Sequence, residues 1–279
     1  MLEIILETLL DSIKILPFLF LTYLLMEYIE HKTSDKIKKI IKKPGGAGPV
    51  IGSVLGCFPQ CGFSVSAANL YAVRVITMGT LISIFLSTSD EMLPIFISSG
   101  TNILIILKII GIKVVIGILA GIIIDYILRN KNKDRKEDIH HLCEDEHCDC
   151  EHGIIKSAVK HTINIFLFIT IISLVINTIV ELIGEDVLHI LFVQNSLLGP
   201  ALTGLIGLIP NCAASVFITQ LYIDEAITLG SLIAGTLVGA GVGLAVLFKM
   251  NKNLKENLKI IGLLYGIGTF TGIIINFIV

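Results

Sequence analysis

The sequence predicts an all-α integral membrane protein made of two inverted-topology repeats, each with three spans and one Pro-broken re-entrant hairpin. Three observations predict this fold: an apolar composition, a gapless internal repeat, and a hydrophobic segment in each repeat that is interrupted by proline. Of 279 residues, 54% are hydrophobic and 16% are charged, against about 25% charged in an average soluble domain. Such a chain cannot cover itself with polar side chains, so we expect a multi-pass protein of the plasma membrane. The net charge of −2 gives no support for nucleic-acid binding.

The internal repeat sets the domain organisation. Pro59-Gln60-Cys61 recurs as Pro210-Asn211-Cys212, 151 residues later, and the run LKIIG at 107–111 returns at the same offset at 258–262. Chance matching of apolar residues would not keep one offset through proline, cysteine and lysine together. The predicted domains are a first membrane repeat over 1–128, a cytoplasmic His/Cys/acidic loop over 129–151, and a second membrane repeat over 152–279.

Each repeat offers four apolar segments of about the length that a membrane span requires. They cover residues 15–30, 49–72, 75–98 and 107–128, then 164–183, 200–223, 226–248 and 259–279. The second segment of each repeat is interrupted at its centre by Pro59 or Pro210, and proline removes a backbone donor from a helix. Each interrupted segment is therefore either one broken span or a re-entrant hairpin, and counting both hairpin arms gives about ten hydrophobic segments in all.

The charge distribution favours the hairpin. Lysine and arginine collect in cytoplasmic loops. With hairpins, the basic loops 32–43 and 249–259 share the side of the central loop, and the acidic stretches 181–186 and 224–225 lie opposite. With single broken spans, 181–186 and 249–259 would share a side. We therefore predict three spans per repeat, a cytoplasmic central loop and both termini outside; the single broken span stays the alternative.

Inverted repeats with interrupted helices are typical of transporters, whose substrate site lies at the repeat interface near the bilayer midplane. The interruptions place Cys61 and Cys212 at equivalent positions, and thiolates are ligands for soft metals and metalloids. Neutral oxygens follow at Gln60, Asn211, Ser64 and Ser215. Cys57, whose repeat equivalent is Leu208, is either a third ligand or a packing residue.

Further polar residues stand in the apolar segments. Asp90 and Glu91 lie within 75–98, and charges inside a membrane usually face a bundle interior or a transport pathway. We expect them to couple transport to a proton or cation; the alternative is a loop end, if the span stops near Leu86. Asn69 and Gln220, which are repeat equivalents, are candidates for the polar lining of the pathway.

The central loop is dense in metal-binding side chains. These are His140, His141, Cys143, His147, Cys148, Cys150 and His152. Imidazoles and thiolates at this density bind Zn-like ions, although their spacing matches no closed zinc-finger pattern. We interpret the loop as a flexible tether that gathers cytosolic metal, with a solvated acidic linker as the alternative. No resident cofactor is required.

The motifs resemble one known family. GCFPQCGFS at 56–64, ANLY at 68–71 and LSTSDE at 86–91 are similar to the ten-transmembrane heavy-metal exporters, which are also labelled arsenic efflux proteins or manganese transporters. Pro210-Asn211-Cys212 fits the second half of that family, and a His-rich central loop is similar to what its members carry. The resemblance implies export of a heavy-metal or metalloid ion and leaves arsenite, Mn, Zn and Cd open.

The leading hypothesis is a secondary exporter rather than an enzyme, whose partners are the lipid bilayer and the transported ion. No Walker motif is present in the sequence, so ATP would have to be used by a separate subunit. Two alternatives stay open: a transmembrane thiol–disulfide electron carrier that uses Cys61 and Cys212, and a metal importer with the same site. The sequence is compatible with a homo-oligomer and does not set an oligomeric state.

Overall fold

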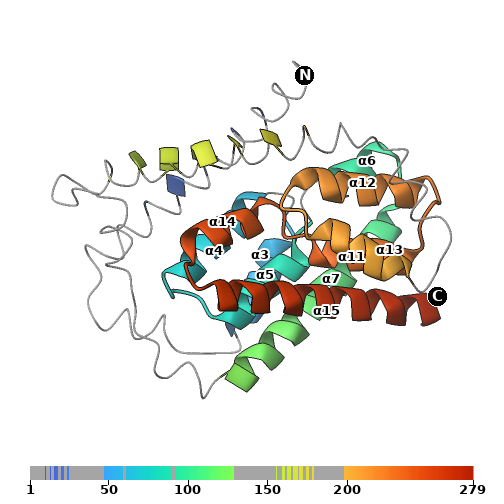
Figure 1. The fold of residues 1–279 in the computed structure, drawn as a ribbon. Helices are drawn as coiled ribbons and strands as arrows, with labels where there is room; N and C mark the ends of the chain where they lie inside the picture. The colour runs from blue at the N-terminus through green and yellow to red at the C-terminus, as the bar shows by residue number, and fades with distance from the viewer. Residues whose placement is uncertain are drawn as a thin grey trace.

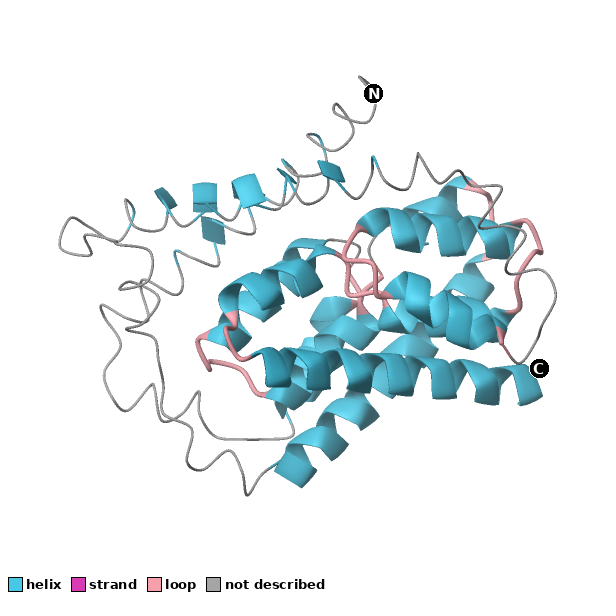
Figure 2. Cartoon of the chain, viewed as in Figure 1, coloured by secondary structure: helices cyan, strands magenta, loops and turns pink. Residues whose placement is uncertain are grey.

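The computed structural model describes residues 47–58, 61–89, 92–128 and 198–278, together with scattered residues between 10 and 24 and between 155 and 178. The described residues form helices joined by loops, without a strand among them (Figure 2). Before the central loop these are α3 (Ala47–Gly56), α4 (Cys61–Ala72), α5 (Met78–Ser87), α6 (Met92–Ser98) and α7 (Ile103–Leu128). After it come α11 (Gly199–Gly207), α12 (Cys212–Ile223), α13 (Leu229–Val238), α14 (Val242–Met250) and α15 (Leu254–Ile278).

The helix boundaries follow the sequence offset of 151 residues. Helices α4 and α12 begin and end at equivalent positions, and so do α5 and α13. The N-caps match as well: the Thr77 hydroxyl accepts a hydrogen bond from the Thr80 N–H at 3.1 Å, and the Thr228 hydroxyl accepts one from the Ser231 N–H at 3.2 Å. Capping oxygens satisfy backbone donors that a helix start leaves open, so local chemistry starts both helices in the same way.

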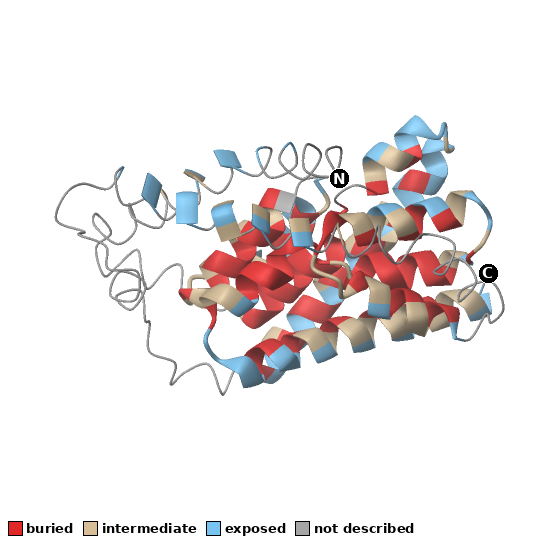
Figure 3. Cartoon of the chain, turned by 45° about the horizontal axis from the view of Figure 1, so that its top comes forward, coloured by how far each residue is buried: buried red, intermediate tan, exposed pale blue. Residues whose placement is uncertain are grey.

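Four stretches of the described residues are long and apolar enough to cross a membrane. They are Met78–Ser98, Ile103–Leu128, Leu229–Met250 and Leu254–Ile278. In their most apolar windows the first and third are 69% and 89% buried, whereas the two long helices α7 and α15 are each only 28% buried. Figure 3 shows buried residues filling the interior of the molecule. The two inner stretches therefore form the centre, and α7 and α15 leave apolar faces for lipid.

Both inner stretches are interrupted. The sequence marks an interruption only in the second segment of each repeat, and the structure adds one in the third. Helix α5 ends at Ser87, α6 begins at Met92, and α13 and α14 are separated by residues 239–241. The Ser87 and Thr88 hydroxyls donate to the carbonyls of Ser83 and Ile84, both at 2.8 Å, which competes with helix continuation. In the second case Gly241 has φ 53°, a conformation that glycine adopts without strain.

Helix α3 lies alongside α5 and runs in the same direction. The backbone of Gly48 approaches the Thr80 side chain, and that of Gly56 approaches the Ser87 side chain, so closely that neither glycine has room for a Cβ. The equivalent contacts join α11 to α13, Gly199 with Ser231 and Gly207 with Gly235. Because α4 starts where α3 stops and ends just before α5 begins, α3 and α4 have their outer ends near the start of α5.

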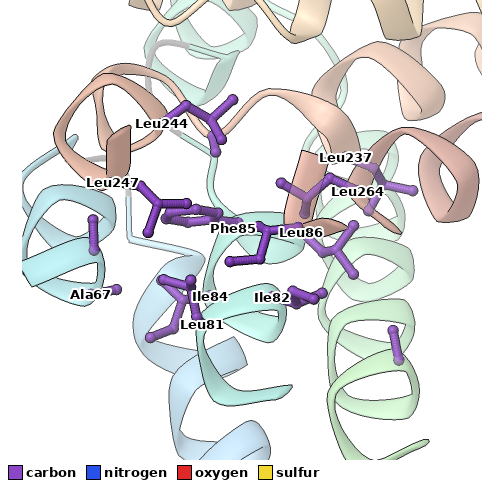
Figure 4. Close-up of a cluster of buried hydrophobic side chains, with 14 of the residues drawn as sticks. Ala67, Leu81, Ile82, Ile84, Phe85, Leu86, Leu237, Leu244, Leu247 and Leu264 are labelled. Atoms are coloured by element: carbon purple, nitrogen blue, oxygen red, sulfur yellow. The ribbon is translucent and has the colours of Figure 1, made fainter. Parts of the chain in front are cut away.

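The two halves of the chain interlock. Helix α4 packs on α14 and α6 lies beside α12, each pair taken from different halves (Figure 1). Phe96 of α6 meets Tyr222 of α12 edge to face, with ring centroids 6.1 Å apart. In the central core, Leu81, Phe85 and other side chains of α5 gather with Leu237, Leu247 and Leu264 from the second half (Figure 4). One apolar core is thus shared by both halves.

An ion pair joins the halves at one end of the bundle. Arg74, in the turn between α4 and α5, lies 2.9 Å from the Glu256 carboxylate in the first turn of α15. The Asn251 amide donates to the same Glu256 oxygen at 3.3 Å and to the Asn257 side-chain oxygen at 2.7 Å, so the carboxylate has a second polar partner. The turn after α4 and the turn before α15 therefore lie at the same end.

Candidate functional site

The four helix interruptions gather near the centre of the molecule. The end of α3 at Gly56 packs on Ser87, where α5 also ends, and the end of α11 at Gly207 packs on the backbone of Gly235 and Gly239, near the end of α13. The first turns of α4 and α14 meet where Ser64 contacts Gly243. We call the described residues of these interruptions, 56–58, 61, 87–89, 92, 207–212 and 236–243, the break cluster.

Lys113 connects the two halves of the break cluster. It stands near the middle of α7, is only 1% exposed, and donates hydrogen bonds to the carbonyl oxygen of Thr88 and to that of Thr236, the latter at 2.9 Å. Thr88 follows the last residue of α5, and Thr236 lies in the last turn of α13. The C-terminal end of a helix carries partial negative charge, so both carbonyls are favourable partners for an ammonium group.

The second-half interruption holds a buried thiol. Cys212 forms no disulfide and lies, 9% exposed, in the first turn of α12. Asn211 is 6% exposed and is the N-cap of that helix, its side-chain oxygen accepting from the Ala213 N–H. Pro210 lies in the bend just before it, where the chain leaves α11. The predicted proline break is thus where α12 starts, and the amide oxygen predicted as a ligand also holds the helix end.

The structure describes only part of the first-half interruption. Cys57, directly after α3, is half-buried, and its thiol donates to the Val54 carbonyl at 2.9 Å. Cys61 is the first residue of α4, while its side chain and residues Pro59 and Gln60 lie outside the described residues. The equivalence of α4 and α12 in length and start gives Cys61 and Cys212 the same position in their helices.

The other predicted polar residues divide into buried and exposed. Ser64 and Asn69, both on α4, are fully buried, and Ser64 belongs to the contact with α14. Ser215 is half-buried on α12. Gln220 is exposed near the end of α12 and donates to the Asp224 carboxylate at 3.0 Å, so the structure does not bring it to the break cluster.

The remaining candidates lie outside the described residues. Asp90 and Glu91 are among them, between the end of α5 at Ser87 and the start of α6 at Met92. The metal-binding side chains predicted in the central loop are also outside: His140, His141, Cys143, His147, Cys148, Cys150 and His152. Within the part of the chain that is described, no three His, Cys, Asp or Glu side chains come together as metal ligands.

Sequence reasoning missed Lys113. Lys113 is the one charged residue within 109–124, which is itself a signal for a functional residue, but the repeat does not point to it because its equivalent is the apolar Leu264. Asp125, on α7, accepts from the Gly79 N–H at 2.9 Å and from the Thr77 hydroxyl at 2.6 Å. It therefore supports the start of α5 rather than the break cluster.

The break cluster combines three kinds of polar group inside an apolar bundle: a buried thiol, carbonyls at helix ends and an ammonium group. Backbone carbonyls at interrupted helices and soft thiols are the ligand types that transporters present to ions. The described residues do not contain a preformed chelate of acidic and imidazole groups.

Comparison with known proteins identifies a family. No curated protein and no solved structure matches the chain. One family model, described as "Putative, 10TM heavy-metal exporter", matches residues 1–198, which include the first-half interruption and the central loop. The apolar stretches of the structure agree with membrane localisation. The chain belongs to this family of heavy-metal exporters.

Proposed function

We propose that the protein exports a soft heavy-metal or metalloid ion through the break cluster, with Cys61 and Cys212 as its thiol ligands. The observation that carries this proposal is the buried thiol of Cys212, which forms no disulfide, at an interruption between apolar helices. Gln60, Ser64 and Ser215 would add neutral oxygens. Asn211 would contribute chiefly by fixing the first turn of α12, which holds the thiol in place.

The two halves are proposed to be inverted repeats. Met78–Ser98 and Leu229–Met250 are equivalent stretches, and each is followed by a long helix that returns across the membrane. The Arg74–Glu256 ion pair supports opposite directions, because it joins the end where the first stretch starts to the end where the second stretch stops. Equivalent stretches that start from opposite faces are related by an axis in the membrane plane.

The segments before these stretches are proposed to be re-entrant hairpins. Helix α3 runs parallel to α5, from the outer end towards the break cluster, and α4 returns to the turn at Arg74. Helices α11 and α12 repeat this course in the second half. Under the alternative of single broken spans, Arg74 and Glu256 would lie on opposite faces, which their separation of 2.9 Å opposes.

The direction of transport and its coupling to protons are proposed from the distribution of charged residues. The basic stretch 249–259 stands at the Arg74 end, so the positive-inside rule makes that face cytoplasmic and puts the metal-gathering loop on it. Asp90 and Glu91, next to the break cluster in sequence, are proposed to take up the proton that drives export. Cargo would pass from the loop to the thiols and leave on the opposite face.

The test is transport by the purified protein in liposomes. Vesicles are loaded in turn with arsenite, Cd²⁺, Zn²⁺ and Mn²⁺, and release is measured with and without a proton gradient. Thiol ligands predict movement of arsenite, Cd²⁺ or Zn²⁺ in preference to Mn²⁺, which prefers oxygen ligands. Movement of Mn²⁺ alone would contradict the thiol site, and movement of none of the four would contradict export.

A further inference from the structure

The proposed thiol site does not use Lys113, yet its ammonium group contacts both halves of the break cluster. Its ammonium group binds two backbone carbonyl oxygens, one at the end of α5 and one near the end of α13. Burial of the whole side chain, 1% exposed, means that these contacts are made inside the bundle.

The position that the ammonium group occupies has the chemistry of a monovalent cation site. Transporters with interrupted helices bind Na⁺ or protons through unwound backbone carbonyls and the C-terminal ends of half-helices. Here carbonyls of this type come from two halves and converge on one cation, which is attached to the chain. An ammonium group is a compact point charge with three donors, close in character to a small hydrated cation.

The buried lysine occurs in only one of the two repeats. The position equivalent to Lys113 is Leu264, which is fully buried in the shared core. A charge inside a membrane protein is costly, so a single lysine kept at one of two equivalent positions calls for a specific function. Packing of the two halves against each other does not require Lys113, since the contact of Ser64 with Gly243 joins the halves without a charged group.

We propose that Lys113 is a tethered cation that fills a carbonyl site for a small monovalent cation between the two halves. This inference deepens the proposed transport function and rests on it: transport would need no Na⁺ or K⁺ at this position, because the chain supplies the charge. Removing the side chain would expose the site to a soluble cation. A neutral side chain of similar length would fill the space and leave the carbonyls without a cation.

The test compares Lys113→Ala with Lys113→Met in the purified full-length protein. Thermal unfolding is measured in ethylammonium, Na⁺ or the bulky cation N-methylglucamine at equal ionic strength. A ligand that binds only the folded state raises the unfolding temperature, here by about 2–4 °C for a site well above its dissociation constant. We expect this rise for Lys113→Ala in ethylammonium or Na⁺, and none for wild type or Lys113→Met.

Leu264→Ala is the matched control, because it opens a cavity at the equivalent position without removing a charge. It is expected to unfold at a lower temperature in all three cations alike. If Lys113→Ala can be purified only in ethylammonium or Na⁺, that dependence supports the proposal. Equal behaviour of Lys113→Ala and Lys113→Met in every cation, or an equal cation response of Leu264→Ala, would overturn it.

Measurements of transport distinguish failure of this inference from failure of the proposed function. Wild-type export should be unchanged when N-methylglucamine replaces Na⁺ and K⁺, and Lys113→Ala should lose export and regain part of it in ethylammonium. A wild-type protein that moves no cargo would refute export, while the unfolding comparison would still decide the role of Lys113. Wild-type export that stops without Na⁺ or K⁺ would refute the tethered cation and leave export intact.

Discussion

Asp125 and Asn276 illustrate how single residues carry the repeat. They are equivalent positions near the ends of α7 and α15, and each accepts a hydrogen bond from a glycine N–H at the start of an inner helix, Gly79 at 2.9 Å and Gly230 at 3.0 Å. An amide oxygen does this in one half and a carboxylate oxygen in the other. The hydrogen bond, rather than the negative charge, is therefore the shared requirement.

This predicts opposite outcomes for two substitutions of Asp125. Asp125→Asn should keep the unfolding temperature close to wild type, because the amide oxygen can still accept from Gly79. Asp125→Ala should cost about 1 kcal/mol, the typical effect of losing a capping side chain. Thermal or denaturant unfolding of the purified variants measures the difference. If both variants lose the same stability, the charge matters and the equivalence with Asn276 is wrong.

At the scale of single residues, the sequence predicts those positions that recur in both repeats. The positions of Cys212, Asn211 and Pro210 at the start of α12 agree with the predicted interruption. Lys113 was missed because its equivalent is apolar, and the exposure of Gln220 could not be read from its buried equivalent Asn69. Equivalent positions in a repeat share backbone structure, while burial depends on neighbours from elsewhere in the chain.

Among the elements, the contact of α4 with α14 depends on a glycine. A Cβ at Gly243 would lie 2.8 Å from the Ser64 Cβ and 2.9 Å from the Ser64 backbone. Backbone atoms within a helix cannot yield to such an approach as a flexible side chain can. The first turns of α4 and α14, which carry parts of the break cluster, are thus held together by close backbone packing.

Gly243→Ala should therefore weaken this helix pair. Overpacking at a close contact costs about 1–3 kcal/mol, and the displacement of α4 should also lower transport. Gly262→Ala is the matched control, because Gly262 lies within α15 with open space where a Cβ would stand. Alanine there should leave stability unchanged or slightly higher. Equal effects of the two substitutions on unfolding would contradict the close contact.

The sequence predicted two of the helix interruptions and missed the other two. Proline marked the interruptions after α3 and α11, because it removes a backbone donor wherever it stands. The interruptions after α5 and α13 have no proline; residues 87–89 are Ser-Thr-Ser and 239–241 are Gly-Ala-Gly, which an apolar helix can also contain. Only the packed structure decides that these stretches end the helix.

Across the whole molecule, the two halves share a core instead of packing as separate domains. Helix α4 lies on α14, α6 lies beside α12, and Lys113 binds carbonyls of both halves. No sequence spacing encodes such contacts, since they join residues far apart in the chain. The repeat and the loop charges predict inverted halves, while the interlock could come only from the three-dimensional structure.

The proposed topology predicts which surface residues share a side of the membrane. Ser98, Asp224 and Lys252 are exposed in turns or at helix ends. As single cysteines in a background without the native ones, Ser98→Cys and Asp224→Cys should react with an impermeant thiol reagent from one side, and Lys252→Cys from the other. Single broken spans would instead pair Ser98→Cys with Lys252→Cys, an outcome that would contradict the hairpins.

The most direct test of the central claim is export by the variant that carries both Cys61→Ser and Cys212→Ser. Wild type and variant are reconstituted in equal amounts, after their unfolding temperatures are shown to agree, and release of arsenite or Cd²⁺ is measured. Replacing even outer-shell partners of a metal site typically costs about 10–100-fold, so loss of both thiols should reduce export by about 100-fold or more. Export by the double variant at the wild-type rate would contradict a thiol site in the break cluster.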